Sequence, residues 1–209
     1  MSGENRIRLL IVDDHAIVRE GVASLIAPEH DMVVVGEAEN GLEGEEAFHR
    51  LRPDVVLMDL QMPEKDGVEA IADIRAKSPN ARIIVLTTYE GDVAAMRALK
   101  AGACGYLLKN ALRKELIDTI RAVHAGKRYV LPKIAQEIAL HAAEDQLTAR
   151  EVSILKQVAA GKANKIIAWE LSVSEDTVKS HLRSVFSKLD VNDRTQAVTV
   201  ALKRGIISL

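Results

Sequence analysis

Polar side chains suited to phosphoryl chemistry follow four short apolar runs in the first part of the sequence. Asp13 and Asp14 follow the run 9–12, Asp59 follows 55–58, Thr87 follows 83–86 and Lys109 follows 106–108. Three carboxylates brought close together repel one another unless a cation lies among them, and an all-oxygen ligand set suits Mg²⁺. Because Mg²⁺ in such sites keeps water ligands that phosphate oxygens can replace, these residues predict a site that accepts a phosphoryl group.

The apolar pattern predicts the elements that must position these side chains. A fifth run, 32–35, lies between the first two, and the intervening segments show helical spacing, as at Ala70, Ile71 and Ile74. Residues 5–125 are therefore predicted to form a five-stranded, doubly wound parallel sheet in an α/β domain. Ligands of such sheets bind beyond the carboxyl ends of the strands, so we expect the five side chains at one edge. The simpler alternative, in which each Asp only caps the following helix, leaves Thr87 and Lys109 unexplained.

Composition and charge predict two domains with different partners. The chain has 209 residues, no apolar stretch long enough to span a membrane, and no basic-then-apolar start typical of a secretory signal. We therefore expect a cytoplasmic protein with no membrane partner. The net charge is −2 overall, but −6 before residue 147 and +4 from there onward, which suggests cations as ligands of the first half and a polyanion as partner of the second. Cys104 is the only cysteine, which excludes an internal disulfide.

Beyond residue 125 the pattern of strands ends. Residues 126–145 are predicted to be a linker with a short helix, and residues 146–209 a small all-α domain. Residues typical of helix N-caps indicate four helix starts: Thr148 with Glu151 as a capping box, then Asn164, Ser174, and either Asn192 or Asp193.

The third of these helices has one apolar and one cationic face. The apolar stripe consists of Val178, Leu182, Val185, Phe186 and Leu189, and the opposite face of Lys179, Ser180, Arg183, Ser184 and Ser187. With the shorter helix before it, from Asn164 to Leu171, this pattern indicates a helix-turn-helix, whose second helix enters the major groove of DNA.

The first domain also resembles the receiver domains of bacterial two-component response regulators. The segments that carry the resemblance are IVDDHAIVREG, DVVLMDLQMPEKDGVEA, IIVLTTYEG and AGACGYLLKN. The resemblance implies a flavodoxin-like fold and Mg²⁺ as cofactor. It implies that Asp59 is the phosphoacceptor and that Asp13, Asp14, Asp59 and the backbone carbonyl of Gln61 hold the metal. It also implies that Thr87 and Lys109 contact the phosphoryl group and that Tyr106 changes rotamer with it.

The second domain is similar, from LTAREVSIL to NDRTQAV, to the DNA-binding domain of LuxR-type regulators. A receiver joined to such a domain is the layout of the NarL/FixJ response regulators. The resemblance implies that Lys179, Ser180 and Arg183 face the groove and that Lys165 and Thr177 contact phosphates. It implies three partners: a sensor histidine kinase, double-stranded promoter DNA, and a second copy of the chain when active. Ile166 and Trp169 depart from the family's usual residues. Ile166 removes the capping-box partner of Asn164. Trp169 is expected to pack, and the alternative is an exposed contact for a partner.

Two other functions fit parts of the pattern. An aspartyl-phosphate phosphohydrolase also uses Mg²⁺ and an Asp nucleophile, but such enzymes carry a second acid two residues later, where this chain has Gln61. An adaptor that presents its C-terminal helices to a protein partner is the second alternative, and salt distinguishes it, because phosphate contacts make the affinity for DNA fall as the salt concentration rises. We therefore predict a phosphorylation-controlled transcription regulator and no enzyme activity beyond self-phosphorylation and self-dephosphorylation at Asp59. Either the receiver covers the DNA-binding helix until it is phosphorylated, or it offers a dimer surface on the predicted fourth helix, residues 92–101, the fifth strand, residues 106–108, and the fifth helix that follows.

Overall fold

The computed structural model describes residues 6–88, 92–110, 113–130, 132–141 and 147–207. It divides into two compact units, which are described separately. The sheet unit contains β1 (Ile7–Val12), β2 (Met32–Ala38), β3 (Val55–Met58), β4 (Ile83–Thr87), β5 (Gly105–Leu108) and β6 (Tyr129–Val130). Its helices are α1 (Ala16–Ile26), α2 (Gly41–Leu51), α3 (Gly67–Lys77), α4 (Asp92–Ala101) and α5 (Arg113–His124). The remaining helices are α6 (Pro132–His141), α7 (Ala149–Ala159), α8 (Asn164–Glu170), α9 (Glu175–Leu189) and α10 (Arg194–Lys203).

The sheet is parallel and its strand order is β2-β1-β3-β4-β5-β6. The chain moves outward from β1 to β2 and then returns past β1 to β3, so the direction of winding reverses between β1 and β3. Crossover loops diverge at such a switch point, and the crevice beyond the carboxyl ends of the strands is where open α/β sheets bind ligands. The register pairs Val12 with Met58, the last residue of each strand.

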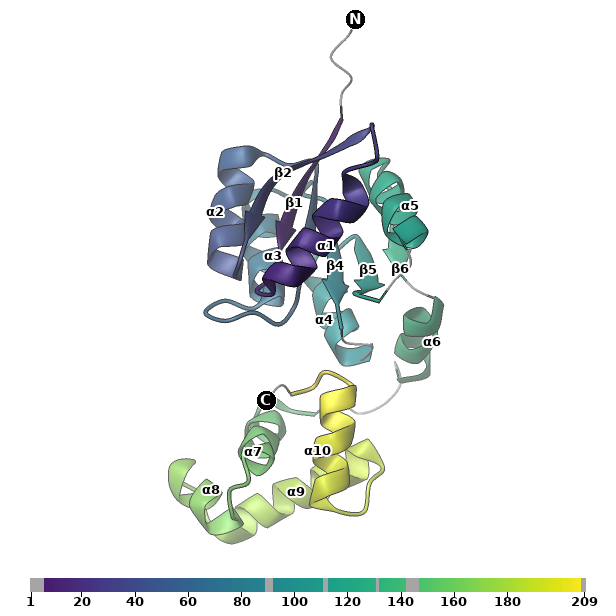
Figure 1. The fold of residues 1–209 in the computed structure, drawn as a ribbon. Coiled ribbons are helices and arrows are strands. Elements are labelled where there is room, and N and C mark those ends of the chain that lie inside the picture. The colour runs from purple at the N-terminus through teal and green to yellow at the C-terminus, as the bar shows by residue number, and fades with distance from the viewer. Residues whose placement is uncertain (1–5, 89–91, 111–112, 131, 142–146, 208–209) are drawn as a thin grey trace, which may run out of the picture. The chain divides into compact units, whose positions relative to one another are not determined.

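Helices cover both faces of the sheet, with α1 and α5 on one face and α2 and α3 on the other (Figure 1). Alternate residues of each strand supply the two faces. Leu9, Ile11 and Leu57 pack with Ile26 of α1 and Ile120 of α5 in one core cluster, and all of them are buried. The neighbouring Leu10, Val56 and Met58 are buried on the other face. The doubly wound α/β fold predicted for this part of the chain is therefore confirmed.

The predicted number of strands was wrong by one, because the sheet has six strands and not the expected five. Tyr129 and Val130 form the short β6, which pairs in parallel with Gly105 and Tyr106 of β5. The Tyr129 main-chain N–H donates to the Cys104 carbonyl at 2.9 Å, and its hydroxyl donates to Glu115 of α5 at 3.0 Å. A strand of two residues is too short to show periodicity, and so the sequence pattern could not reveal it.

The segment predicted to be a linker contains β6 and the short helix α6. The predicted domain boundaries at residue 5 and between residues 145 and 146 lie outside the described residues, and the boundaries stay predictions. A search of the described residues finds no helix that combines the length and the hydropathy of a membrane span.

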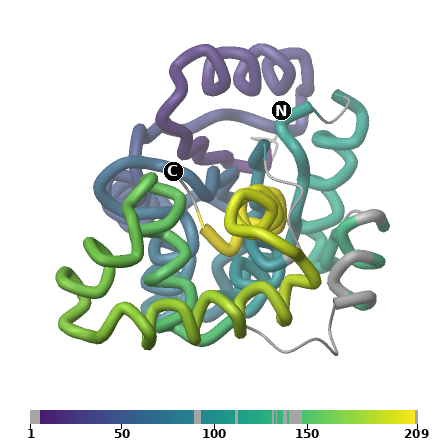
Figure 2. Tube along the Cα trace, turned by 90° about the horizontal axis from the view of Figure 1, so that it is seen from below, coloured from purple at the N-terminus to yellow at the C-terminus, as the bar shows by residue number. Residues whose placement is uncertain are grey.

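The helical unit, α7 to α10, has a core of its own. The long α9 runs along one side of it and packs against α7, α8 and α10 (Figure 2). Val178, Leu182, Val185 and Leu189 of α9 are buried, so the predicted apolar stripe faces the core, although Phe186 is only half-buried.

The predicted N-caps of three of these helices are confirmed. Thr148 and Glu151 form the capping box of α7, while Ser174 caps α9 and Asp193 caps α10. The prediction that Asn164 caps α8 was wrong: the N-cap is Ala163, and the side-chain oxygen of Asn164 is buried without a hydrogen-bond partner. With Ala163 as the N-cap, Ile166 lies at N3, the position of a capping-box partner, and because Ala163 has no side-chain acceptor no capping box forms at this helix.

Glu151 is a buried carboxylate that ties α7 to α9. Its side chain accepts hydrogen bonds from the Ser184 hydroxyl at 2.6 Å, Lys188 Nζ at 2.9 Å and the Thr148 N–H at 2.7 Å. Burial alone would raise the pKa of this carboxyl, but the three donors outweigh it and lower the pKa to about 2. Ser184 therefore faces α7, and the prediction that it belongs to the exposed cationic face was wrong.

Replacing Glu151 should destabilise the helical unit. A carboxyl with a lowered pKa stabilises the fold above its unfolded pKa of about 4.3, and this contribution is lost as the pH falls toward the folded value. We expect Glu151→Gln to lower the free energy of unfolding by about 2 kcal/mol at pH 7, and the difference from wild type to shrink steadily below about pH 4. Urea unfolding at several pH values measures both. The exposed Glu175→Gln is the control, and equal stability of wild type and Glu151→Gln at pH 7 would contradict the assignment.

Candidate functional site

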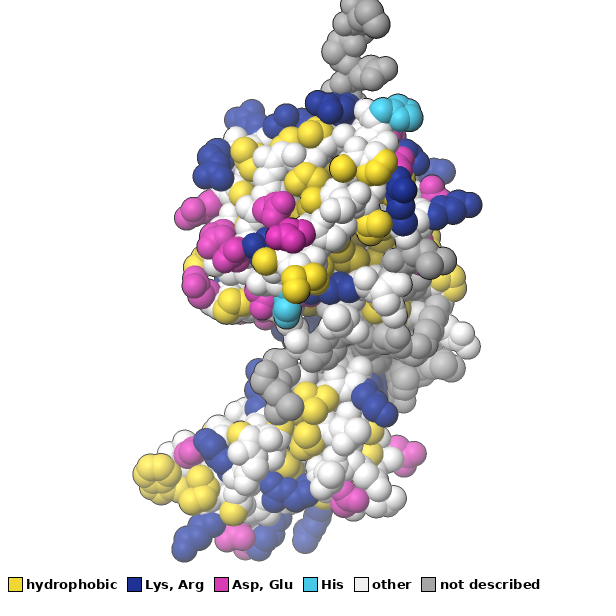
Figure 3. Space-filling view, in the orientation of Figure 1, with side chains coloured by type: hydrophobic (Ala, Val, Ile, Leu, Met, Phe, Trp, Pro, Cys, Tyr) yellow, Lys and Arg dark blue, Asp and Glu magenta, His cyan; other side chains and the backbone are white. Residues whose placement is uncertain are grey.

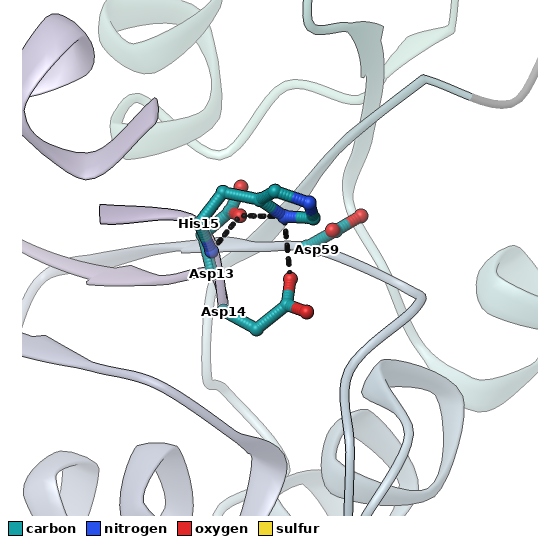
Figure 4. A group of neighbouring side chains, drawn as sticks. All are labelled: Asp13, Asp14, His15 and Asp59. Atoms are coloured by element: carbon teal, nitrogen blue, oxygen red, sulfur yellow. Dashed lines mark hydrogen bonds and ion pairs between the residues drawn. The ribbon is translucent and has the colours of Figure 1, made fainter. Parts of the chain in front are cut away.

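Three carboxylates meet beyond the carboxyl ends of β1 and β3. Asp13 and Asp14 come directly after β1 and Asp59 directly after β3, and their side chains point toward a common space together with His15 (Figure 4). One ligand atom from each of these four residues lies within 4.8 Å of the others. Asp13 and Asp59 are buried, with 2% and 4% of their surface exposed, while Asp14 is exposed. The predicted convergence of the acidic residues is therefore found at the switch point of the sheet.

Lys109 supplies the cation that two buried carboxylates require. It follows β5, and its Nζ lies 2.7 Å from Asp13 Oδ2 and 2.7 Å from Asp59 Oδ2. The main-chain N–H of Lys109 donates to the Thr87 carbonyl at 2.7 Å, and this bond fixes the backbone from which the Lys109 side chain extends. Lys109 thus links the ends of four strands: its ammonium group joins β5 to Asp13 and Asp59, which follow β1 and β3, and its main-chain N–H joins β5 to β4.

The electrostatics distinguish the two partners of the Asp59–Lys109 pair. Burial raises the pKa of the Asp59 carboxyl, and the hydrogen bonds from Lys109 Nζ and the Leu60 N–H reverse only part of this effect. Burial alone would lower the pKa of the Lys109 ammonium, but its two carboxylate partners outweigh burial and raise it. Asp59 is therefore a carboxylate whose negative charge is incompletely compensated by the protein, which favours a further cation beside it.

His15 is a neighbour of this cluster that the sequence analysis did not assign to it. Its Nδ1 lies 2.7 Å from Asp14 Oδ1 and its main-chain N–H donates to Asp13 Oδ1 at 3.0 Å, although the ring is 66% exposed. The main-chain bond holds the turn after β1 in place and helps to orient Asp13.

Thr87 and Tyr106 lie in the two strands beyond β3, and both are buried. Thr87 ends β4, and Tyr106 pairs with Val85 in the register of β4 and β5. Burial and, to a smaller extent, the negative charge of Asp59 raise the pKa of the Tyr106 hydroxyl. Gln61 is exposed in the loop after Asp59, and its role as a carbonyl ligand stays a prediction.

The loop after β3 is held close to the site by a glycine and a partly buried lysine. A Cβ at Gly67 would lie 1.9 Å from the main-chain oxygen of Asp59, so only glycine allows α3 to begin here. Lys65 Nζ pairs with Glu45 of α2 at 2.6 Å and with Asp73 of α3. Sequence analysis did not single out these residues, because charged residues in a loop usually lie in solvent.

Arg19 was also missed, although the sequence carried a signal for it. It lies at the spacing of Val22 and Ile26, the buried positions of α1, and only 8% of its surface is exposed. A charged residue on the apolar stripe of a helix predicts a buried ion with partners. Its guanidinium donates to the main-chain oxygen of Asp13 at 2.8 Å.

The donor set at the acidic site fits Mg²⁺. Mg²⁺ is bound in proteins by one or two carboxylates and keeps several water ligands, and the carboxylates of Asp13, Asp14 and Asp59 offer oxygens close together with one side exposed. The acidic cluster is therefore of the kind that binds Mg²⁺ in receiver domains.

The helical unit presents a cationic face on α9. Lys179, Ser180 and Arg183 are exposed on the side opposite the buried stripe, and Lys165 is exposed on α8. Lys and Arg side chains gather along the part of this unit formed by α8 and α9 (Figure 3). Lys179 Nζ lies 3.3 Å from Asp176 and 3.6 Å from Glu175, while Thr177 is held in the N-terminal cap by Ser174.

Trp169 is exposed, so the expectation that it packs is wrong, and the alternative that it contacts a partner stays a prediction. Its surface is 80% exposed, and that of Ile166, one helical turn earlier on α8, is 46% exposed. The two side chains lie on the face of α8 opposite Ile167 and Ala168, which are buried in the core of the unit.

Comparison with known proteins assigns both halves of the chain. Residues 9–143 match the response regulator receiver domain, and residues 145–201 match the bacterial regulatory proteins of the luxR family. The chain is 43% identical to the transcriptional regulatory protein YdfI of Bacillus subtilis strain 168, over 97% of this chain and 98% of the relative. It is 40% identical to LiaR of the same strain, over 97% of this chain and 100% of the relative.

Solved structures show the same layout. The response regulator ChrA of a heme-sensing two-component system is 36% identical with a TM-score of 0.59, covering 97% of this chain and 100% of its own. The response regulator RcsB in its complex with DNA is 26% identical with a TM-score of 0.69, covering 95% and 99%. The chain therefore belongs to the response regulators that join a receiver domain to a luxR-family DNA-binding domain, and it is a phosphorylation-controlled transcription regulator and not an enzyme.

Proposed function

We propose that Asp59 is the phosphoacceptor of this regulator and that a sensor histidine kinase is its phosphodonor. One Asp59 carboxylate oxygen forms a bond to phosphorus as the P–N bond of the donor phosphohistidine breaks, and the leaving imidazole takes a proton from solvent. The observation that carries the proposal is the convergence of Asp13, Asp14 and Asp59 with Lys109 at the switch point of a parallel sheet.

The chain's own residues prepare this transfer. Asp13, Asp14, Asp59 and the Gln61 carbonyl would hold Mg²⁺, which neutralises charge on the transferring phosphoryl group when bound. Lys109, already 2.7 Å from Asp59, keeps its ammonium beside the phosphoryl oxygens. The buried position of Asp59 limits access of water to the acyl phosphate.

The new phosphoryl group adds negative charge and strong acceptors at the end of β3. The Thr87 hydroxyl and Lys109 turn toward these oxygens, and Tyr106 fills the space that Thr87 leaves. A rotamer change of this kind alters the surface formed by α4 and β5, so a local change of charge biases a two-state element.

The helical unit binds promoter DNA in this proposal. Lys179, Ser180 and Arg183 on the exposed face of α9 enter the major groove, and Lys165 and Thr177 contact phosphates. The relative RcsB has been solved with two dimers bound to two DNAs, which supports DNA binding as a dimer here. In this proposal the two copies contact each other through α10. The kinase and the DNA that this function requires place the protein in the bacterial cytoplasm.

Replacing the phosphoacceptor tests the receiver half directly. We expect wild-type protein incubated with Mg²⁺ and acetyl phosphate to gain one phosphoryl group, and Asp59→Asn to gain none, because the amide lacks a nucleophilic oxygen anion. Intact-protein mass spectrometry measures the gain. Asp54→Asn, at the opposite end of β3, is the matched control and should be labelled like wild type. Labelling of Asp59→Asn at the wild-type rate would refute the assignment.

The DNA-binding half predicts a change in the dependence of affinity on salt. Each neutralised phosphate contributes about 0.9 to the slope of log affinity against log salt, so Lys179→Ala should lower the slope by about one if Lys179 contacts a phosphate. Arg183→Ala should weaken specific binding by about tenfold or more if Arg183 contacts a base. Gel-shift titrations on selected genomic fragments measure both. Lys156→Ala, exposed on α7, is the control. Unchanged affinity in Lys179→Ala and Arg183→Ala would show that α9 is not the reading helix.

The affinity of the isolated fragment 146–209 separates the two routes of signal transfer. The fragment contains the whole core of α7 to α10 and is expected to fold. If the unphosphorylated receiver covers α9, the fragment should bind DNA more tightly than the unphosphorylated full chain. If the phosphorylated receiver instead drives dimerisation, the fragment should bind more weakly than the phosphorylated full chain and be monomeric in sedimentation.

A further inference from the structure

Arg19 is a buried cation that lies directly behind the acidic site. It belongs to α1, the helix that follows Asp13 and Asp14, and only 8% of its surface is exposed. Burying a guanidinium group is costly unless its N–H groups are paired, so the chain must satisfy it where it lies. The function proposed above gives Arg19 no role.

The guanidinium joins the end of β1 to the end of β2. Nη1 donates to the main-chain oxygen of Asp13 at 2.8 Å, Nε to Glu37 at 3.2 Å and Nη2 to Glu39 at 2.6 Å. The rigid, planar fork of arginine has donors enough for three partners in fixed directions, which a lysine ammonium cannot match.

Asp13 is thereby held at both ends of its backbone. Its N–H donates to the Ala38 carbonyl at 3.1 Å, and its carbonyl accepts the bond from Arg19. The Asp13 carbonyl lies in the same peptide plane as the Asp14 N–H. Arg19 therefore fixes the orientation of the peptide plane between Asp13 and Asp14. The direction of the exposed Asp14 side chain depends on that orientation.

The two glutamates offset the charge of Arg19. Glu37 and Glu39 together with Arg19 carry a net charge of −1, so the group does not repel a cation at the acidic site. Its contribution must then come from geometry, because a hydrogen bond to a main-chain oxygen orients a neighbouring ligand without touching the metal.

We propose that Arg19 is a positioning residue for the magnesium ligands Asp13 and Asp14, acting through the carbonyl of Asp13. The inference rests on the proposed function of this site as a magnesium-dependent phosphoacceptor. Partners of metal ligands typically change metal affinity about 10–100-fold when they are removed.

A positioning role for Arg19 and a purely electrostatic role predict opposite changes in Mg²⁺ affinity when Arg19 is replaced. Arg19→Met removes a positive charge near the site and leaves Glu37 and Glu39 unpaired, so electrostatics alone would make Mg²⁺ bind more tightly. If Arg19 positions the ligands, Mg²⁺ should instead bind about tenfold more weakly.

The experiment is a calorimetric titration of full-length protein with Mg²⁺, paired with the rate of labelling by acetyl phosphate across Mg²⁺ concentrations. In Arg19→Met we expect half-saturation at about tenfold higher Mg²⁺, with the labelling rate at saturating Mg²⁺ within about twofold of wild type. Arg121→Met is the matched control. Arg121 also bridges two carboxylates, Glu29 and Asp31, but at the opposite end of β2, and its loss should leave Mg²⁺ affinity unchanged.

The outcomes separate this inference from the proposed function. Equal or tighter Mg²⁺ binding by Arg19→Met, with wild type binding and labelled normally, overturns the role of Arg19 alone. A wild type that neither binds Mg²⁺ nor is labelled overturns the phosphoacceptor site and this inference with it. If Arg19→Met fails to fold by circular dichroism, Arg19→Lys decides. The lysine keeps the positive charge but lacks the planar fork of arginine. Arg19→Lys should therefore weaken Mg²⁺ binding about threefold or more. Unchanged Mg²⁺ binding by this variant refutes the proposal.

Discussion

The sheet unit depends on one ammonium group that lies between two buried carboxylates. Asp13 and Asp59 come from strands that are neighbours in space but 46 residues apart in sequence, and burying both would be prohibitive without a cation. Lys109 provides it at 2.7 Å from each, and its own backbone is fixed by β4. The carboxyl ends of four strands are thus held together through Lys109 at the point where the apolar core ends.

The loops that carry this site are also held by charged side chains that are largely shielded from solvent. Arg19 joins the turn after β1 to the end of β2, and Lys65 joins the loop after β3 to α2 and α3. Apolar side chains could pack here, but they would not set the direction of a carboxylate, because hydrophobic contact is not directional. Hydrogen bonds from charged donors are directional and short, so they can fix ligand positions in a part of the molecule that must remain open to solvent.

Sequence patterns predicted the features that depend on local order and the meeting of the acidic residues at the strand ends, whereas several other contacts between distant segments were missed. The run before Asp59 is a buried strand with the predicted limits, and the capping box of Thr148 is present, because both are set by neighbouring residues. The inward position of Ser184 depends on Glu151 of α7, and the two-residue β6 depends on β5, so both are set by segments elsewhere in the chain. Periodicity assigned Ser184 to the outer face because it lies at the edge of the apolar stripe, where a single buried acceptor decides its direction.

Two carboxylates of this chain show how environment decides how fully a buried charge is compensated. Glu151 receives three donors, Ser184, Lys188 and the Thr148 N–H, and its pKa falls to about 2 in spite of burial. Asp59 receives Lys109, which it shares with Asp13, and the Leu60 N–H, and burial raises its pKa. The donors of Glu151 already compensate its negative charge, so a further cation would stabilise it little. The negative charge of Asp59 remains incompletely compensated. A carboxylate in that condition favours a divalent cation beside it, and the same cation stabilises the additional negative charge that a phosphoryl group would bring.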